Sequence, residues 1–95
     1  MLQTNLTTLA GFVKKVYPKF ITPSGVHVSR FVLSHESVQF ENDISRKVAF
    51  EMFCVKVGEF LDEDMVGSYI EVCGFIHINR QKQLILHISK IKKLN

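Results

Sequence analysis

Apolar and polar residues alternate with a period of two through most of this 95-residue chain. Ile70, Val72 and Ile76, for example, recur at even-numbered positions of one short segment. Successive side chains of a β-strand point to opposite faces, so this period predicts strands that each bury one face. So short a chain has room for one hydrophobic core, and we expect residues 1–95 to form a single domain.

Turn residues divide the alternating pattern into separate strands. The segment Thr22-Pro23-Ser24-Gly25 predicts a tight turn, because proline fixes φ and glycine supplies conformational freedom. Residues 36–45 and 79–83 are polar and predict a hairpin loop and a short turn. Phe60, Leu61 and Met65 have approximately helical spacing, so a short helix is expected near residues 59–64. The expected strands are residues 5–16, 26–35, 46–57, 68–76 and 84–91.

Five antiparallel strands in so few residues cannot cover both faces of an open sheet, whereas a small barrel buries one face and removes most edges. Gly11 and Gly74 lie within expected strands and would permit the sharp coiling of such a barrel. With the helix between strands three and four, this order predicts an all-β oligonucleotide/oligosaccharide-binding (OB) fold. Phe50, Met52 and Cys54 are expected in its core, together with most of the phenylalanines.

The chain resembles the bacterial primosomal replication protein N (PriB) family, whose members are relatives of the single-stranded-DNA-binding proteins. The resemblance covers nearly the whole chain and is most specific in the Pro-Ser-Gly turn and the following Phe-Val-Leu-x-His-x-Ser-x-Gln segment. The residues that carry it are Thr22–Val26, Phe31–Gln39, Arg46, Met52, Val72–Ile76, Leu86, His87 and Ile91.

This resemblance implies a homodimeric OB-fold protein of the replication-restart primosome. Such a protein binds single-stranded DNA and bridges a restart helicase to a helicase-loading primosome protein. The chain departs from the family pattern in three places: Ala49 replaces an exposed tryptophan, Glu36 replaces a basic residue, and the loop between strands four and five is short. These departures keep open an alternative function, a protein–protein adaptor with weak or no affinity for DNA.

Proteins bind single-stranded nucleic acid by combining cations for phosphate with aromatic rings for stacking on bases. The net charge of +3 permits an anionic partner, and the basic residues gather in a few segments that adjoin expected turns. Tyr17 and Phe20 interrupt the basic segment 14–20, and Phe53 lies on the mixed face of the third strand. The expected DNA-binding residues are Lys14, Lys15, Tyr17, Lys19, Phe20, Arg46, Lys47, Phe53, Arg80 and Lys82.

The sequence predicts a non-enzymatic protein that needs no metal or cofactor. The four histidines and two cysteines have no zinc-ligand spacing, and no nucleophile elbow or glycine-rich phosphate loop is present. Cys54 paired with a histidine is a weaker alternative, because both cysteines lie in apolar segments where a reduced, buried thiol is expected. No apolar run is long enough to span a bilayer, and the N-terminal residues do not resemble a signal peptide, so a cytoplasmic location is expected.

Overall fold

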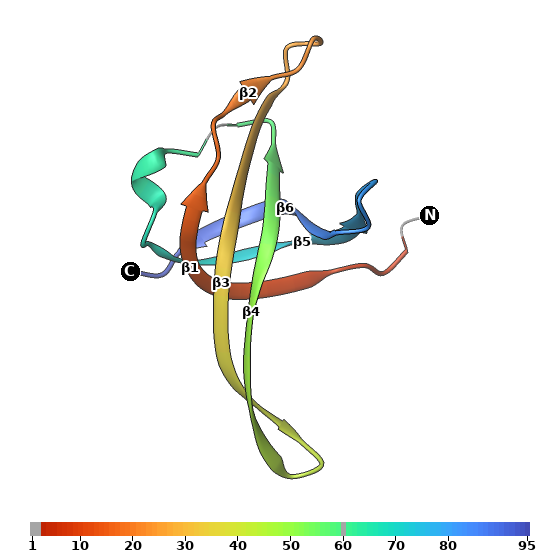
Figure 1. Ribbon diagram of the computed structural model, residues 1–95, viewed down its shortest axis with the longest axis vertical. Helices are drawn as coiled ribbons and strands as arrows, with labels where there is room; N and C mark the ends of the chain where they lie inside the picture. Colours follow the sequence, from red (N-terminus) through yellow and green to blue (C-terminus); the bar gives the residue numbers. More distant parts are fainter. Residues whose placement is uncertain (1–2, 60) are drawn as a thin grey trace.

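A computed structural model describes residues 3–59 and 61–95 and consists almost entirely of β-strands (Figure 1). Every strand predicted from the alternating pattern is present, and a two-residue strand, β2, is added before the Pro-Ser-Gly turn. In chain order the elements are β1 (Thr7–Val16), β2 (Phe20–Ile21), β3 (His27–Glu41), β4 (Ile44–Val57), the 3-10 turn η1 (Glu63–Met65), β5 (Tyr69–Ile78) and β6 (Leu84–Lys93).

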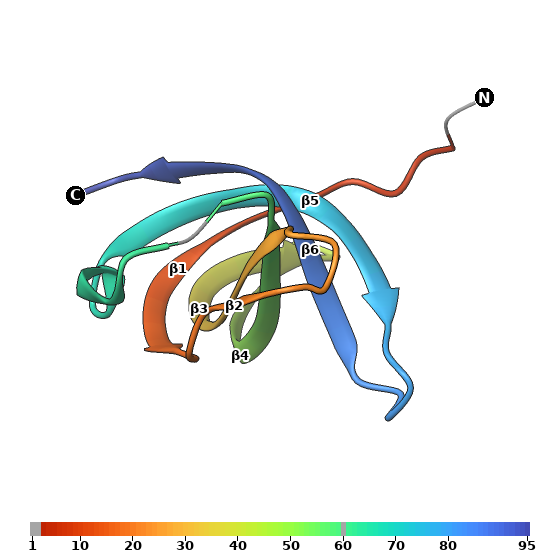
Figure 2. The ribbon, with the colours of Figure 1, turned by 90° about the horizontal axis from the view of Figure 1, so that it is seen from above.

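The five long strands close into a barrel, as the sequence predicts. The sheet order is β1-β5-β6-β4-β3-β2, and an additional pairing between β1 and β3 joins the two ends (Figure 2). All strand pairs are antiparallel except β4 and β6, which run parallel and pair Phe53 with Ile85. The architecture is therefore the expected OB-type barrel.

The interior of the barrel is filled mainly by aliphatic side chains. Leu33, Ile70, Val72 and Leu86 have no exposed surface, and Phe31 is 1% exposed. Burying each such side chain contributes about 1.5–3 kcal/mol to stability. The register brings inward-facing residues from every long strand together, so one continuous core holds the barrel.

Two glycines allow neighbouring strands to approach more closely than any side chain would permit. A Cβ atom on Gly74 would lie 1.8 Å from the carbonyl oxygen of His87, and one on Gly11 would lie 2.3 Å from that of Ser34. The β5–β6 register also shifts between Cys73 and Gly74. The role predicted for Gly11 and Gly74 in coiling the barrel is consistent with these contacts.

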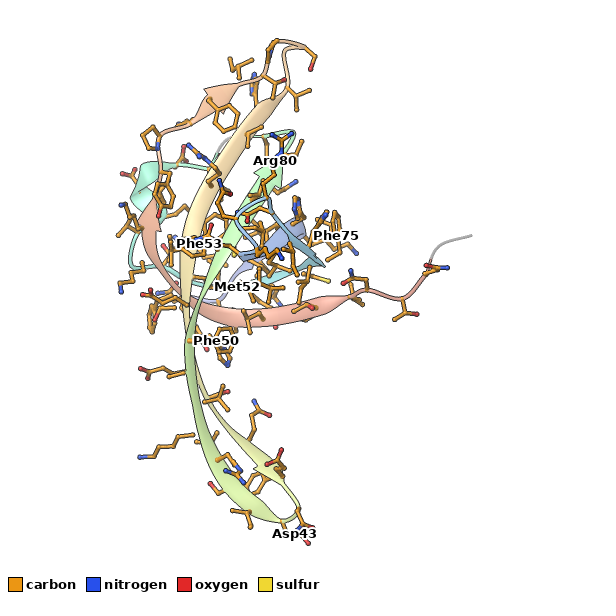
Figure 3. All side chains as sticks on the ribbon, turned by 45° about the vertical axis from the view of Figure 1, so that its right-hand side comes forward. Asp43, Phe50, Met52, Phe53, Phe75 and Arg80 are labelled. Carbon is orange, nitrogen blue, oxygen red and sulfur yellow. The ribbon has the colours of Figure 1, made fainter. Side chains whose placement is uncertain are left out.

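The hairpin loop predicted over residues 36–45 is wrong. Strands β3 and β4 stay paired in unbroken register as far as Glu41 and Ile44, which leaves only Asn42 and Asp43 as a two-residue turn. Both turn residues have positive φ, as asparagine and aspartate readily adopt in tight hairpins. The polar composition reflects solvent on both faces of this hairpin, which projects beyond the barrel (Figures 1 and 3).

The prediction that most phenylalanines lie in the core is also wrong. Of the phenylalanines described, only Phe31 is buried, and Phe50, expected in the core beside Met52 and Cys54, is 37% exposed. The close strand approaches at the glycines narrow the interior, and aliphatic side chains from five strands already fill it. The phenylalanines left on the surface are Phe12, Phe20, Phe40, Phe50, Phe53 and Phe75.

The connection between β4 and β5 holds a three-residue 3-10 turn, η1, where the sequence predicts a short helix. Leu61 and Met65 pack against the core, as their spacing suggests, while Phe60 lies outside the described residues. No helix in the part of the chain that the structure describes is long and apolar enough to cross a membrane.

Replacing Gly74 with alanine is expected to destabilise the barrel by at least about 3 kcal/mol, because the methyl group would overlap backbone atoms that cannot move aside. Urea denaturation of the two proteins measures the difference. Gly25→Ala is the control: its methyl group meets nothing within 4 Å, so only the positive φ adds a cost, of about 1–2 kcal/mol. Equal stability of the Gly74→Ala variant and the unsubstituted protein would contradict the close approach.

Candidate nucleic-acid interface

The barrel register places side chains from five strands in two rows on the outer face. In the first row, Arg30 of β3 lies opposite Val55 of β4, which lies opposite His87 of β6 and then Phe75 of β5. Residues paired in register share one face of a sheet. The second row runs parallel to the first and contains Lys15, Val32, Phe53, Ile85 and His77.

A groove of about 330 Å³ lies across these rows. Tyr17 borders it at the end of β1, Phe53 forms part of its floor, and Asn79 and Gln83 border it from the β5–β6 turn. The connection after β1 and the β5–β6 turn therefore flank one groove. The described residues that line it are Tyr17, Arg30, Phe31, Phe53, Cys54, Val55, Asn79, Gln83, Ile85 and His87, none of them acidic.

Positive charge and aromatic rings are interleaved at the β1–β2 side of the groove. The Arg30 guanidinium carbon lies 5.0 Å from the centre of the Phe20 ring and 5.7 Å from that of Tyr17. The Lys15 Nζ atom lies 4.6 Å from the centre of the same Tyr17 ring. The Tyr17 N–H donates to the Arg30 carbonyl at 2.9 Å, which fixes the connection beside β3. The arrangement holds two cations over rings while leaving their N–H groups able to bind phosphate.

A second ring cluster lies on β5 and β6. Phe75 and His87 stack with ring centres 4.8 Å apart and planes only 1° apart, and the His77 ring lies 6.1 Å from His87. Phe75 is 48% exposed (Figure 3). Partial burial and then the nearby His77 imidazole lower the pKa of His87, so this imidazole is mainly neutral at pH 7.

The structure places the lysines and arginines predicted to bind DNA in different parts of the molecule. Lys14 forms an ion pair with Glu51, and Arg46 pairs with Glu41 through Nε at 3.0 Å. Arg46 and Lys47 lie on the projecting hairpin, opposite Gln39 and Val38, so the structure does not bring them to the groove. Arg80 borders an adjoining hollow formed with His77 and His87. Lys82, with φ of 63°, lies in the same β5–β6 turn.

The sequence analysis missed Arg30, Phe75, His77 and His87 on this face. His35, by contrast, has a structural role: its ring nitrogens lie 2.6 Å from the Ala10 carbonyl oxygen and 2.8 Å from Ser37 Oγ. The alternation of apolar and polar residues could have identified Phe75 and His77 as outward-facing. Both occupy the face of β5 opposite to Val72 and Gly74. The parallel β4–β6 pairing brings these residues of β3, β4, β5 and β6 onto one surface. No short sequence pattern predicts that pairing.

The alternative of a Cys54 nucleophile finds no support in the geometry. Cys54 is 1% exposed, its Sγ lies 3.6 Å from the Met52 carbonyl oxygen, and burial raises the pKa of its thiol to about 12. A thiol with so high a pKa is almost entirely protonated at neutral pH and is a poor nucleophile. No cluster of three metal-ligating side chains occurs among residues 3–59 and 61–95.

Comparison with known proteins gives consistent matches over nearly the full chain. The family described as "Another single-strand binding protein family" matches residues 5–90. A "Replication restart protein PriB" of Neisseria meningitidis serogroup C is 34% identical, with 94% of this chain and 93% of the relative covered.

Two solved structures share the fold. The PriB protein of Ralstonia solanacearum superimposes with a TM-score of 0.85 at 21% identity, covering 98% of this chain and 100% of that one. The dimeric structure of the N-terminal domain of PriB from Thermoanaerobacter tencongensis gives 0.70 at 15% identity, covering 96% and 97%.

In the native protein at neutral pH, only Cys73 is expected to react with a thiol reagent, because it is partly exposed whereas Cys54 is buried. The number of thiols modified per chain, measured in buffer and in urea, checks this. We expect about one modified thiol in buffer and about two in urea. The Cys73→Ser variant should be nearly inert until it unfolds or the pH approaches the raised pKa of Cys54. Rapid modification of Cys54 in that folded variant would contradict the packing described.

Proposed function

Because the chain belongs to the PriB family of single-strand binding proteins, we propose that it binds single-stranded DNA in the groove across β3, β4 and β6. The observation that carries this proposal is the position of Arg30, which lines the groove close to the rings of both Tyr17 and Phe20. A guanidinium placed there can bind a phosphate while the neighbouring rings remain available to bases. This combination matches the requirements of single-strand recognition.

The proposed contacts divide into stacking rings and phosphate-binding cations. Tyr17, Phe20 and Phe53 provide the rings, each expected to contribute about 1–3 kcal/mol for every base engaged. The cations are Lys15, Lys19, Arg30, Arg80 and Lys82, with Lys14 as a peripheral contact because Glu51 neutralises part of its charge. Arg46 and Lys47 are proposed to contact only DNA that extends along the hairpin.

Binding of this kind is expected to serve the restart of replication, the process for which the similar PriB protein of Neisseria meningitidis is named. We propose that the protein acts there without catalysis, as a homodimer that bridges DNA to a restart helicase and a helicase-loading protein. The dimer surface proposed is β1 with the residue before it: Leu6 is 71% exposed, and Phe12 of β1 is 53% exposed and packs against Tyr69. The dimeric PriB domain of Thermoanaerobacter tencongensis supports this assembly by its fold.

Binding to a dT oligomer should be sensitive to salt. If roughly four of the proposed cations contact phosphates, release of counterions predicts a log–log slope of about −3, so a fourfold rise in salt weakens binding about sixtyfold. Fluorescence anisotropy at several salt concentrations measures this slope. Arg30→Ala should reduce the magnitude of the slope by about 0.7.

The double variant Arg46→Ala/Lys47→Ala is the matched control, because both cations lie on the hairpin. It should leave the slope on a short oligomer nearly unchanged. A larger loss in this double variant than in Arg30→Ala would place the DNA on the hairpin instead. Absence of binding in the unsubstituted protein would favour the protein–protein adaptor.

The homodimer is expected to depend on the exposed apolar surface of β1. Phe12→Glu should convert a dimer into a monomer, because a carboxylate would be buried in the interface without a partner. Light scattering at micromolar concentration measures the mass, and circular dichroism checks that the fold remains. Ile44→Glu, at a similarly exposed apolar position at the tip of the β3–β4 hairpin, serves as the control. A mass of one chain for the unsubstituted protein would refute the dimer.

A further inference from the structure

The ring cluster of Phe75, His77 and His87 is separate from the rings around Arg30. It lies at the other end of the outer rows, on β5 and β6. Phe75 and His87 are direct cross-strand partners, and His77 occupies the next outward position along β5. His87 borders both the groove and the adjoining hollow, whereas Arg80 borders only the hollow. A strand of DNA that leaves the groove beside Phe53 would therefore pass over this cluster.

From this geometry we propose that Phe75, His77 and His87 form a second nucleotide-binding site, in which Phe75 stacks on a base and the two imidazoles bind the adjacent phosphate. The inference rests on the proposed single-stranded-DNA binding. It adds a proton-dependent contact, so the affinity for DNA should rise as the pH falls through the imidazole range.

The preformed stack explains how the site would work. The Phe75 and His87 planes are parallel within 1°, so the two rings act as one aromatic surface whose orientation needs no adjustment when a base is added. A neutral imidazole extends this surface, and a protonated one adds a donor and a positive charge. The stack therefore favours a nucleotide, with its base beside its phosphate, over a simple anion.

Basic groups from three elements share the groove or the adjoining hollow with His87. His77 comes from β5, Arg30 from β3 and Arg80 from the β5–β6 turn, while β4 contributes the apolar Val55. Tyr17 and the buried Cys54 are the other titratable groups that line the groove. Among the described residues that line the groove and the hollow there is no carboxylate. Burial and repulsion by His77 lower the pKa of His87, and a bound phosphate would reverse that balance. DNA binding should therefore take up protons.

The test compares the affinity for a dT oligomer at about pH 8 and about pH 5.5, because thymine does not titrate between them. At constant salt the affinity should rise at least about fivefold at the lower pH, and the salt slope should steepen by about 0.7 for each imidazolium engaged. The double variant His77→Gln/His87→Gln keeps hydrogen-bonding side chains of similar size but cannot be protonated. It should bind equally well at both pH values. Phe75→Leu should weaken binding at both.

His27→Gln is the matched control. His27 also lies on β3, but three residues before Arg30, and therefore on the opposite face of the strand. It should retain the full dependence on pH. If the double variant keeps that dependence, or if the unsubstituted protein binds equally at both pH values, the second site is refuted while the groove remains. Failure to bind at either pH would refute the proposed function itself. Circular dichroism at both pH values separates these outcomes from unfolding.

Discussion

The parallel pairing of β4 with β6 is the contact on which the rest of the molecule depends. It joins two halves of the chain through the register Phe53–Ile85 to Lys56–Ile88 and so closes the barrel. Without it, the five long strands would form one open sheet in the order β4-β3-β1-β5-β6, with Val55 and His87 on its opposite edges. Closing the long loop between two strands that are far apart in sequence costs conformational entropy, and this cost opposes their pairing. Packing of Cys54 and Leu86 in the core offsets that cost.

Closure also determines which aromatic side chains are available to a ligand. The strands approach so closely at Gly11 and Gly74 that the interior accommodates aliphatic side chains and a single described phenylalanine, Phe31. The other described phenylalanines lie outside, where Phe53 and Phe75 share the outer face with Arg30. Exposed rings of this kind are unfavourable in water unless a partner covers them. Bases of single-stranded DNA have the flat apolar faces that such rings can stack on.

Local sequence patterns were sufficient to predict the strands and the barrel, because alternation and turn residues act over a few positions. The core positions Met52 and Cys54 followed from the same pattern. The long hairpin was missed because polar composition indicates exposure to solvent, and a two-stranded ribbon exposed on both faces has the composition of a loop. Arg30 and His87 were missed for another reason. Their significance depends on neighbours from four strands, and no local pattern encodes that register.

The central claim is that single-stranded DNA crosses the outer face from Tyr17 to Phe75. Amide chemical shifts of the labelled protein, followed during titration with a short dT oligomer, test it most directly. The account predicts that the largest changes occur at Arg30, Phe53 and His87 and in the β5–β6 turn, with little change along the hairpin near Arg46. Changes confined to the hairpin, or to the lysines near the end of β6, would contradict it.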